Sequence, residues 1–199
     1  NVSIGADAGK ALTTGSNNLS MGNLAIGGNT AATGSNNIAF GGQSGYGLTT
    51  GSCNITIGCS AGNKITTGAN NTLVGSKAGC SITTSSGSVA IGNCALCSVS
   101  TTTRNLAIGD LAGLKITSGN ENTVIGSGTG RALTTGAQNI LHGSQAAEGL
   151  TTGSYNVIMG NYSSYSMQGA GKNVAIGYFS QALNVSSSDN VAIGHCSLK

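Results

Sequence analysis

The sequence predicts an all-β protein, a parallel β-solenoid (β-roll) of about twelve 17-residue coils. Three observations lead to this fold class: the motif Asn-x-x-x-Gly returns at a fixed interval, Val, Ile and Thr are evenly spaced within each interval, and the chain has 34 Gly and no Pro. Gly and β-branched residues at this density oppose helical repeats. A unit this short cannot bury its own apolar side chains, so successive copies have to stack on one another.

The repeats cover the whole chain, so we expect 1–199 to form a single solenoid domain. Every interval is 17 residues except the one from 18 to 37, which is 19. Counted from each start, position 1 is Asn in every copy but one, where Ser88 replaces it, and position 5 is always Gly. The repeats start at residues 1, 18, 37, 54, 71, 88, 105, 122, 139, 156, 173 and 190.

Positions 2 to 4 of each repeat are expected to form a short strand. Positions 2 and 4 are apolar in most copies and point to one side of a strand, while position 3 points to the other. Position 3 is also mostly apolar, often Ala, and a strand that is apolar on both sides predicts cover on both sides. The Gly at position 5 suits a tight corner that follows the strand.

Position 1 is expected to form an Asn ladder along the solenoid. Stacked coils place equivalent residues one strand spacing apart, and Asn side chains can then hydrogen-bond from coil to coil, as they do in cross-β assemblies. The predicted ladder consists of Asn1, Asn18, Asn37, Asn54, Asn71, Asn105, Asn122, Asn139, Asn156, Asn173 and Asn190.

Positions 12 to 14, usually Leu-Thr-Thr, are expected to form a second short strand, and Gly-Ser-Asn at positions 15 to 17 the turn that closes the coil. Alternation along such a strand would turn position 13 outward and position 14 to the opposite side. The exposed rank of position 13 resembles the threonine ladders of ice-binding solenoids, which have two ranks on one face. It comprises Thr13, Thr49, Thr66, Thr83, Thr134 and Thr151.

The strand motifs resemble a known family of repeats. The segments that begin at Ser88, Asn173 and Asn190 read S/N-Val-Ala-Ile-Gly, and the one at Asn105 reads Asn-Leu-Ala-Ile-Gly. This motif is similar to the head repeats of YadA-like trimeric autotransporter adhesins and to related repeats of phage and large-virus fibre proteins. The resemblance implies a left-handed β-roll in which three chains pack side by side, with attachment to surfaces as the role. The adhesin repeat is commonly shorter, so the additional residues here must enlarge the coil or extend a corner.

Six cysteines provide the main candidate chemistry. Cys80 and Cys97 both occupy position 10 of neighbouring coils, so their Cα atoms are expected about one strand spacing apart, within the ~4.4–6.8 Å range of disulfides. A disulfide or plain packing is the preferred interpretation. Cys94 and Cys97 have C-x-x-C spacing, but zinc would need a second pair or a His partner that the sequence does not supply.

The last part of the chain, 156–199, departs from the pattern, because Leu-Thr-Thr-Gly gives way to Met167-Gln-Gly-Ala and Asn184-Val-Ser-Ser. Degenerate repeats of this kind are typical of a cap or a junction with another domain. Aromatic residues gather in the same region, and a patch that stacks on sugars or on a protein partner is the alternative. This patch would comprise Tyr162, Tyr165, Tyr178 and Phe179.

Composition argues against several functional classes. A net charge of +3 is too small to indicate nucleic-acid binding, and the apolar runs are interrupted by Gly too often for membrane insertion. The five acidic residues are scattered over different repeats and form no catalytic pair in sequence register. We therefore expect no enzymatic activity, no cofactor and no metal site.

The sequence thus predicts a structural fibre or adhesin segment of a surface or virion appendage, extracellular in location. It would provide a rigid rod and present a face to a cell-surface glycan or protein receptor, most readily as a homotrimer. Two alternatives remain open: a self-assembling extracellular filament, that is, a homopolymer, and a monomeric ice- or glycan-binding solenoid that uses the Thr rank.

Overall fold

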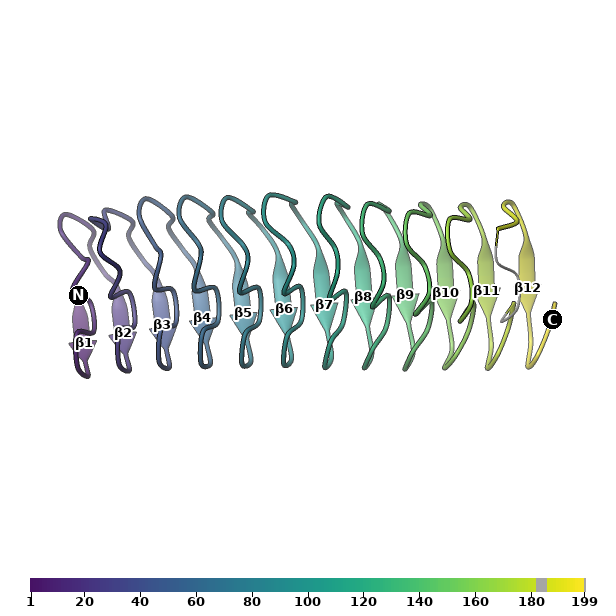
Figure 1. Cartoon of the computed structure of the whole chain (residues 1–199), viewed down its shortest axis with the longest axis horizontal. Coiled ribbons are helices and arrows are strands. Elements are labelled where there is room, and N and C mark those ends of the chain that lie inside the picture. Colours follow the sequence, from purple (N-terminus) through teal and green to yellow (C-terminus); the bar gives the residue numbers. More distant parts are fainter. Residues whose placement is uncertain (182–185, 199) are drawn as a thin grey trace.

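The chain is an all-β solenoid in which every coil contributes one strand to a single parallel sheet (Figure 1). The computed structural model describes residues 1–181 and 186–198, and within these ranges it contains twelve strands and no helix. The strands are β1 (Val2–Ile4), β2 (Leu19–Met21), β3 (Ile38–Phe40), β4 (Ile55–Ile57), β5 (Thr72–Val74), β6 (Val89–Ile91), β7 (Leu106–Ile108), β8 (Thr123–Ile125), β9 (Ile140–His142), β10 (Val157–Met159), β11 (Val174–Ile176) and β12 (Val191–Ile193).

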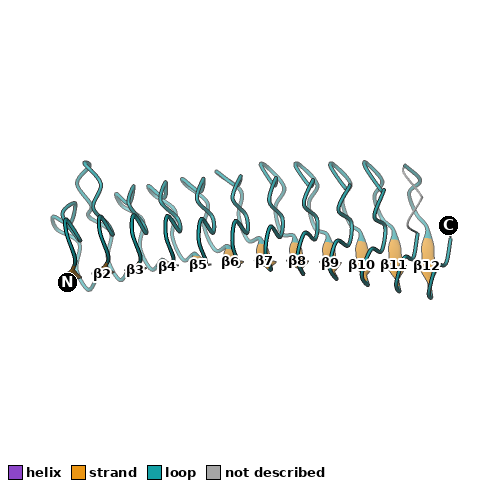
Figure 2. Ribbon diagram, turned by 60° about the horizontal axis from the view of Figure 1, so that its bottom comes forward, coloured by secondary structure: helices purple, strands orange, loops and turns teal. Residues whose placement is uncertain are grey.

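The predicted register is confirmed in each strand pair. The strands follow one another in chain order, and each pairs in parallel with the next, so that Val89 faces Leu106 and Val157 faces Val174. Leu19 pairs with Ile38 across the 19-residue interval, which means that the two additional residues lie outside the strand. At ~4.8 Å per step, twelve strands make a row roughly 50 Å long. Figure 2 shows the strands along one side of this row and loops along the other.

Position 3 is the side of the strand that faces the interior of the coil. From Ser20 to Ala192 every residue at this position is buried, whereas positions 2 and 4 are half-buried or exposed. Positions 8 and 12 complete the core, as Leu73, Ala78 and Ile82 do in the fifth coil, where all three are 0% exposed. The core is therefore a narrow column of mostly small or aliphatic side chains that each coil continues from the last.

The expectation of a second strand at Leu-Thr-Thr is wrong. These residues form bends, and the described residues contain only one isolated bridge there, between Leu12 and Ala32. The hydrogen bonds give the reason. The carbonyl of Thr66 accepts from the backbone N–H of both Thr49 and Gly51, so a single acceptor serves two donors and no ladder can extend.

The Asn ladder has the predicted position and a specific hydrogen-bond pattern. The side chain of Asn54 donates through Nδ2 to Asn37 Oδ1 (3.1 Å) and to the carbonyl of Gly68 in its own coil (2.9 Å). Its Oδ1 accepts from the backbone N–H and from Nδ2 of Asn71, at 3.1 and 3.0 Å. Asn54, like Asn122 and Asn139, therefore closes its own coil and joins it to both neighbours.

The turn before each ladder residue also has a fixed conformation. The residue at position 17 has positive φ in every coil where it is present, for example 57° at Asn17 and 58° at Asn70. Asn tolerates this left-handed conformation better than most residues. In the recurring Gly-Ser-Asn-Asn segment, the first Asn therefore makes the turn and the second forms the ladder.

Candidate functional site

The outer face of the sheet is the largest candidate interaction surface. We call it the apolar face and define it as the side chains at positions 2 and 4 of the strands, which point away from the core. Ile91 is 38% exposed, Ile140 47% and Met159 37%. The twelve strands contribute Val2, Ile4, Leu19, Met21, Ile38, Phe40, Ile55, Ile57, Thr72, Val74, Val89, Ile91, Leu106, Ile108, Thr123, Ile125, Ile140, His142, Val157, Met159, Val174, Ile176, Val191 and Ile193.

The apolar face is continuous from end to end. Polar residues enter it only at Thr72, Thr123 and His142, and His142 is exposed between its strand partners Ile125 and Met159. The row is roughly 50 Å long and about 10 Å wide, which is the length of one three-residue strand. Its area is therefore about 500 Å². This is the size of the largest apolar patches on monomeric proteins, which are often functional. Within 1–181 and 186–198, no segment provides the full cover that the sequence predicted on this side, because positions 2 and 4 of every strand stay half-buried or exposed.

The four aromatic residues of the predicted patch come together at one corner of the last coils. The rings of Tyr162 and Phe179 are stacked with centroids 5.1 Å apart, Tyr165 lies 5.9 Å from Tyr162, and Tyr178 packs edge-on against Phe179 at 4.9 Å. His195 extends the group by stacking on Tyr178 at 5.4 Å. Tyr165 and Tyr178 remain exposed, so the cluster is accessible from solvent.

The solenoid continues through this region without interruption of the strands. β10, β11 and β12 keep the same register as the earlier strands although the Leu-Thr-Thr-Gly pattern fails. Part of the sequence Asn184-Val-Ser-Ser, at 184 and 185, lies outside the described residues. The described strands of 156–199 therefore behave as further coils, and a role as a cap or junction remains a prediction.

The threonine rank differs from the prediction in one respect. Each of the six predicted hydroxyls donates to the carbonyl of position 13 in the next coil, as Thr49 does to Thr66 at 3.0 Å. The segment bends instead of forming a strand, and of the six predicted threonines only Thr13 is exposed, while the other five are half-buried. Position 14 is the exposed rank and consists of Thr14, Thr33, Thr50, Thr67, Thr84, Thr101, Thr135 and Thr152.

The six cysteines are all free thiols. Cys80 and Cys97 occupy neighbouring coils as predicted, and Cys80 Sγ donates to the Cys97 carbonyl at 3.6 Å. Burial, together with the nearby thiols of Cys80 and Cys94, raises the pKa of the Cys97 thiol to about 12. Among the described residues no group of three or more His, Cys, Asp or Glu side chains has a metal-binding arrangement.

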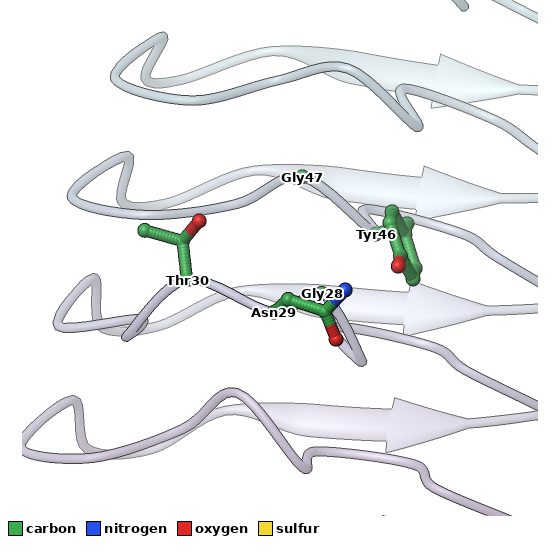
Figure 3. A pocket seen from close by; sticks show the side chains of 5 residues that line it. All are labelled: Gly28, Asn29, Thr30, Tyr46 and Gly47. Atoms are coloured by element: carbon green, nitrogen blue, oxygen red, sulfur yellow. The ribbon is translucent and has the colours of Figure 1, made fainter.

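The two-residue insertion in the second coil opens a small hollow at the side of the solenoid. Figure 3 shows Gly28, Asn29 and Thr30, in the segment lengthened by the insertion, beside Tyr46 and Gly47 of the next coil. The cavity has a volume of about 210 Å³, and an adjoining open depression of about 290 Å³ is also lined by Gly28, Asn29 and Thr30. The 19-residue interval was the sequence signal for this irregularity.

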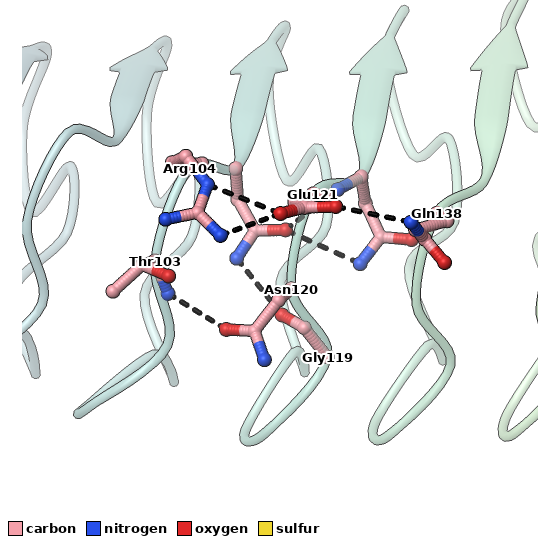
Figure 4. Close-up of polar contacts among 8 residues, drawn as sticks. Thr103, Arg104, Gly119, Asn120, Glu121 and Gln138 are labelled. Atoms are coloured by element: carbon pink, nitrogen blue, oxygen red, sulfur yellow. Dashed lines mark hydrogen bonds and ion pairs between the residues drawn. The ribbon is translucent and has the colours of Figure 1, made fainter.

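A polar cluster joins three coils at position 17 on the surface (Figure 4). Arg104 donates through Nε to Glu121 at 3.1 Å, and Gln138 Nε2 donates to the other carboxylate oxygen at 3.1 Å. Both side chains of the ion pair are largely exposed. The hydrogen bond and the charge of Arg104 lower the pKa of the Glu121 carboxyl, and this cluster was not among the predicted sites.

No helix in the part of the chain that the structure describes is long and apolar enough to cross a membrane. Comparison with known proteins gives no match to a family model, to a curated protein or to a solved structure.

Proposed function

We propose that this chain is a rigid structural segment that assembles with copies of itself through the apolar face. The observation that carries the proposal is the continuity of this face over twelve strands, with about 500 Å² of apolar surface. Exposed apolar surface of this size is a cost for a monomer in water and a driving force for association.

A second copy of the same chain is the partner that fits the face best. The side chains of positions 2 and 4 repeat at the strand spacing, ~4.8 Å, along the whole row. Another copy offers the same spacing, so that ridges and grooves can stay in register over the full length. The resemblance to trimeric adhesin heads favours three copies, and the role would then be that of a shaft or head of a surface or virion appendage outside the cell.

In this proposal the aromatic cluster at the last coils presents a surface to a receptor, which could be a glycan or a protein. The rings of Tyr165 and Tyr178 are exposed and held by their neighbours, and such rings bind sugars or apolar side chains at a small entropic cost.

Sedimentation velocity on the purified chain tests the proposal. We expect one elongated trimer. The double variant Ile57→Glu with Ile91→Glu places charges on the apolar face of the fourth and sixth coils and should yield monomers with an unchanged circular dichroism spectrum. The matched control, Thr67→Glu with Thr101→Glu, places the same charges at exposed position 14 of the same coils and should remain trimeric.

A monomeric parent chain at concentrations of tens of micromolar would overturn self-assembly through the apolar face. Long polydisperse polymers would instead support the filament alternative, especially if the charged face variant still polymerised. An assembly that responds equally to both double variants would assign the interface to another side of the solenoid.

The second candidate function, binding to ice, is favoured by the two parallel threonine ranks. Position 14 faces solvent, position 13 is mostly half-buried, and both recur once per coil, so two rows of threonines run along the same segment of the solenoid. The test is thermal hysteresis of the parent chain against a variant with Thr67→Lys and Thr84→Lys. Hysteresis that is absent from the parent, or retained in full by the variant, would exclude this function for the two ranks.

A further inference from the structure

The joint between the fifth coil (71–87) and the sixth coil (88–104) is the place where the Asn ladder is interrupted. Ser88 stands at position 1, and its backbone N–H still donates to Asn71 Oδ1 at 3.0 Å. The amide that would donate from the next coil is missing, and the Ser88 hydroxyl instead contacts Ser85 Oγ at 3.2 Å. Asn71 Oδ1 therefore accepts one hydrogen bond where that of Asn37, Asn54 or Asn122 accepts two.

The interruption also affects the following joint. Asn105 Nδ2 donates to Thr102 Oγ1 (3.0 Å) and to the carbonyl of Gly119 (2.9 Å), but not to a ladder residue of the sixth coil. The sixth coil is thus the one internal coil, among those described, that takes part in no Asn-to-Asn side-chain bond; only the Ser88 N–H bond to Asn71 Oδ1 and the Asn105 Nδ2 bond to Thr102 Oγ1 remain there. A connection of another kind at this place would compensate for the loss.

Three cysteines lie at this joint. Cys80 is in the fifth coil and Cys94 and Cys97 are in the sixth, and all three are half-buried. Backbone hydrogen bonds on both sides of the pair hold Cys80 and Cys97 at equivalent places in the two adjacent coils. Gly79 N–H donates to the Ala95 carbonyl at 2.9 Å, and Thr83 N–H donates to the Ser100 carbonyl at 3.0 Å.

These contacts set the separation of the two coils near Cys80 and Cys97. Stacked residues in parallel coils are ~4.8 Å apart at Cα, which falls within the ~4.4–6.8 Å that disulfides span. The Cys80 sulfur already lies 3.6 Å from the carbonyl oxygen of Cys97. Only side-chain rotation is then needed to bring the two sulfur atoms together.

We propose that Cys80 and Cys97 form a disulfide that fastens the fifth coil to the sixth at the interruption of the Asn ladder. The oxidant is a small-molecule disulfide such as oxidised glutathione. One protein thiolate attacks it, forms a mixed disulfide and releases one glutathione thiol, and the second protein thiolate then displaces the other. Two protein thiols are oxidised to the disulfide, their two protons pass to the two departing glutathione thiolates, and one small disulfide is thereby reduced to two thiols.

Cys94 defines the competing product. A Cys94–Cys97 bridge would close a four-residue segment within one coil and would not connect coils. The crosslink between coils closes a whole turn of the solenoid, and the backbone hydrogen bonds on both sides of the pair already hold its ends together. The Cys80–Cys97 pairing is therefore the one that the stacked geometry selects.

The test is oxidation of the purified chain with oxidised glutathione, followed by proteolysis without reduction and mass mapping of the crosslinked peptides. We expect Cys80–Cys97 as the main product in the parent chain. It should be lost in Cys80→Ser and in Cys97→Ser and retained in Cys94→Ser. Position 10 accepts Lys, Tyr, Asn, Leu, Arg and Glu in other coils, so the position-10 variants should fold, which circular dichroism checks.

Hydrogen exchange gives a second readout. The amide of Thr72 donates to the Ser88 carbonyl at 2.9 Å and therefore reports on the joint between the fifth and sixth coils. Oxidation should slow its exchange at least tenfold in the parent chain and leave it unchanged in Cys80→Ser. Predominant Cys94–Cys97 pairing, persistent mixed disulfides with glutathione, or a Cys80–Cys97 bridge that does not slow exchange at Thr72 would each overturn the proposal.

Discussion

The Asn ladder makes its strongest prediction at Asn139, in the middle of an uninterrupted stretch. Its side chain is 0% exposed and takes part in four hydrogen bonds. Nδ2 donates to Asn122 Oδ1 (3.0 Å) and to the Gly153 carbonyl (2.9 Å), while Oδ1 accepts from the backbone N–H (3.0 Å) and from Nδ2 (2.9 Å) of Asn156. Replacement by Ala removes all four and leaves buried partners unsatisfied.

The magnitude follows from these four bonds. A net hydrogen bond contributes about 1 kcal/mol, and an orphaned buried donor or acceptor costs about 1–3 kcal/mol. Asn139→Ala should therefore lower the free energy of unfolding by about 4 kcal/mol or more. The matched control is Gln138→Ala, one residue earlier, where the side chain is exposed and donates once to Glu121. The control should change the free energy by less than about 0.5 kcal/mol, as is usual for surface substitutions.

Guanidinium unfolding followed by circular dichroism measures the global effect. Hydrogen exchange at the Thr123 amide, which donates to the Asn139 carbonyl, and at the Ile140 amide, which donates to the Asn156 carbonyl, measures it locally. Because a solenoid behaves approximately as a row of coupled units, the defect should first open the joints on both sides of Asn139. A loss below about 1 kcal/mol, with normal exchange at both amides, would refute the argument that the ladder holds the coils together.

Three further predictions address the corner, the core and the surface charges. Gly41→Ala should lower the free energy of unfolding, measured by denaturant titration, by more than about 3 kcal/mol. Gly41 has φ +121°, and a Cβ there would lie 2.7 Å from the Gly58 backbone. The control Gly42→Ala should be nearly neutral, because its Cβ would meet nothing nearer than 3.9 Å. Gln181→Leu should raise the free energy of unfolding by about 1 kcal/mol, since Gln181 Oε1 is buried without a hydrogen-bond partner among the described residues. The sixth coil already has Leu at the equivalent position. A destabilised variant would contradict this account of the core. NMR titration should place the pKa of Glu121 below that of an unpaired Glu, and Arg104→Met should raise it. A lowered pKa in the folded state means that the pair stabilises the fold at neutral pH and that this contribution is lost as the pH falls through the folded-state pKa. A Glu121 pKa that is the same in the parent chain and in Arg104→Met would disprove the assignment.

The repeat period determined most of the architecture. A 17-residue interval with Asn at position 1 and Gly at position 5 fixes which residues stack, because equivalent positions of identical units have to lie above one another. The parallel register, the strand positions and the buried ladder at residues such as Asn54 follow directly. The corner at position 5 also follows, since only Gly adopts its backbone conformation without strain.

The tertiary structure decided which side of each strand faces inward. Positions 2, 3 and 4 are all mostly apolar, so alternation alone gives two equivalent choices. The coil closes on the side of position 3, which holds small residues such as Ala90 as well as bulky ones such as Leu141, and the side chains of positions 2 and 4 remain outside. The apolar face is thus a consequence of the side on which the coil closes, which the local pattern does not encode.

The same limit explains the other differences. Leu-Thr-Thr has strand propensity, but one carbonyl accepts two backbone N–H donors, as that of Thr66 does, so the segment bends; the second threonine is exposed and the first is mostly half-buried. The proximity of Cys94 to Cys97 and Cys80, and the hollow at Asn29, depend on how turns of different coils lie against each other. The sequence by itself determined the spacing of the units, and the packing between them determined which groups are buried, which are exposed and which meet.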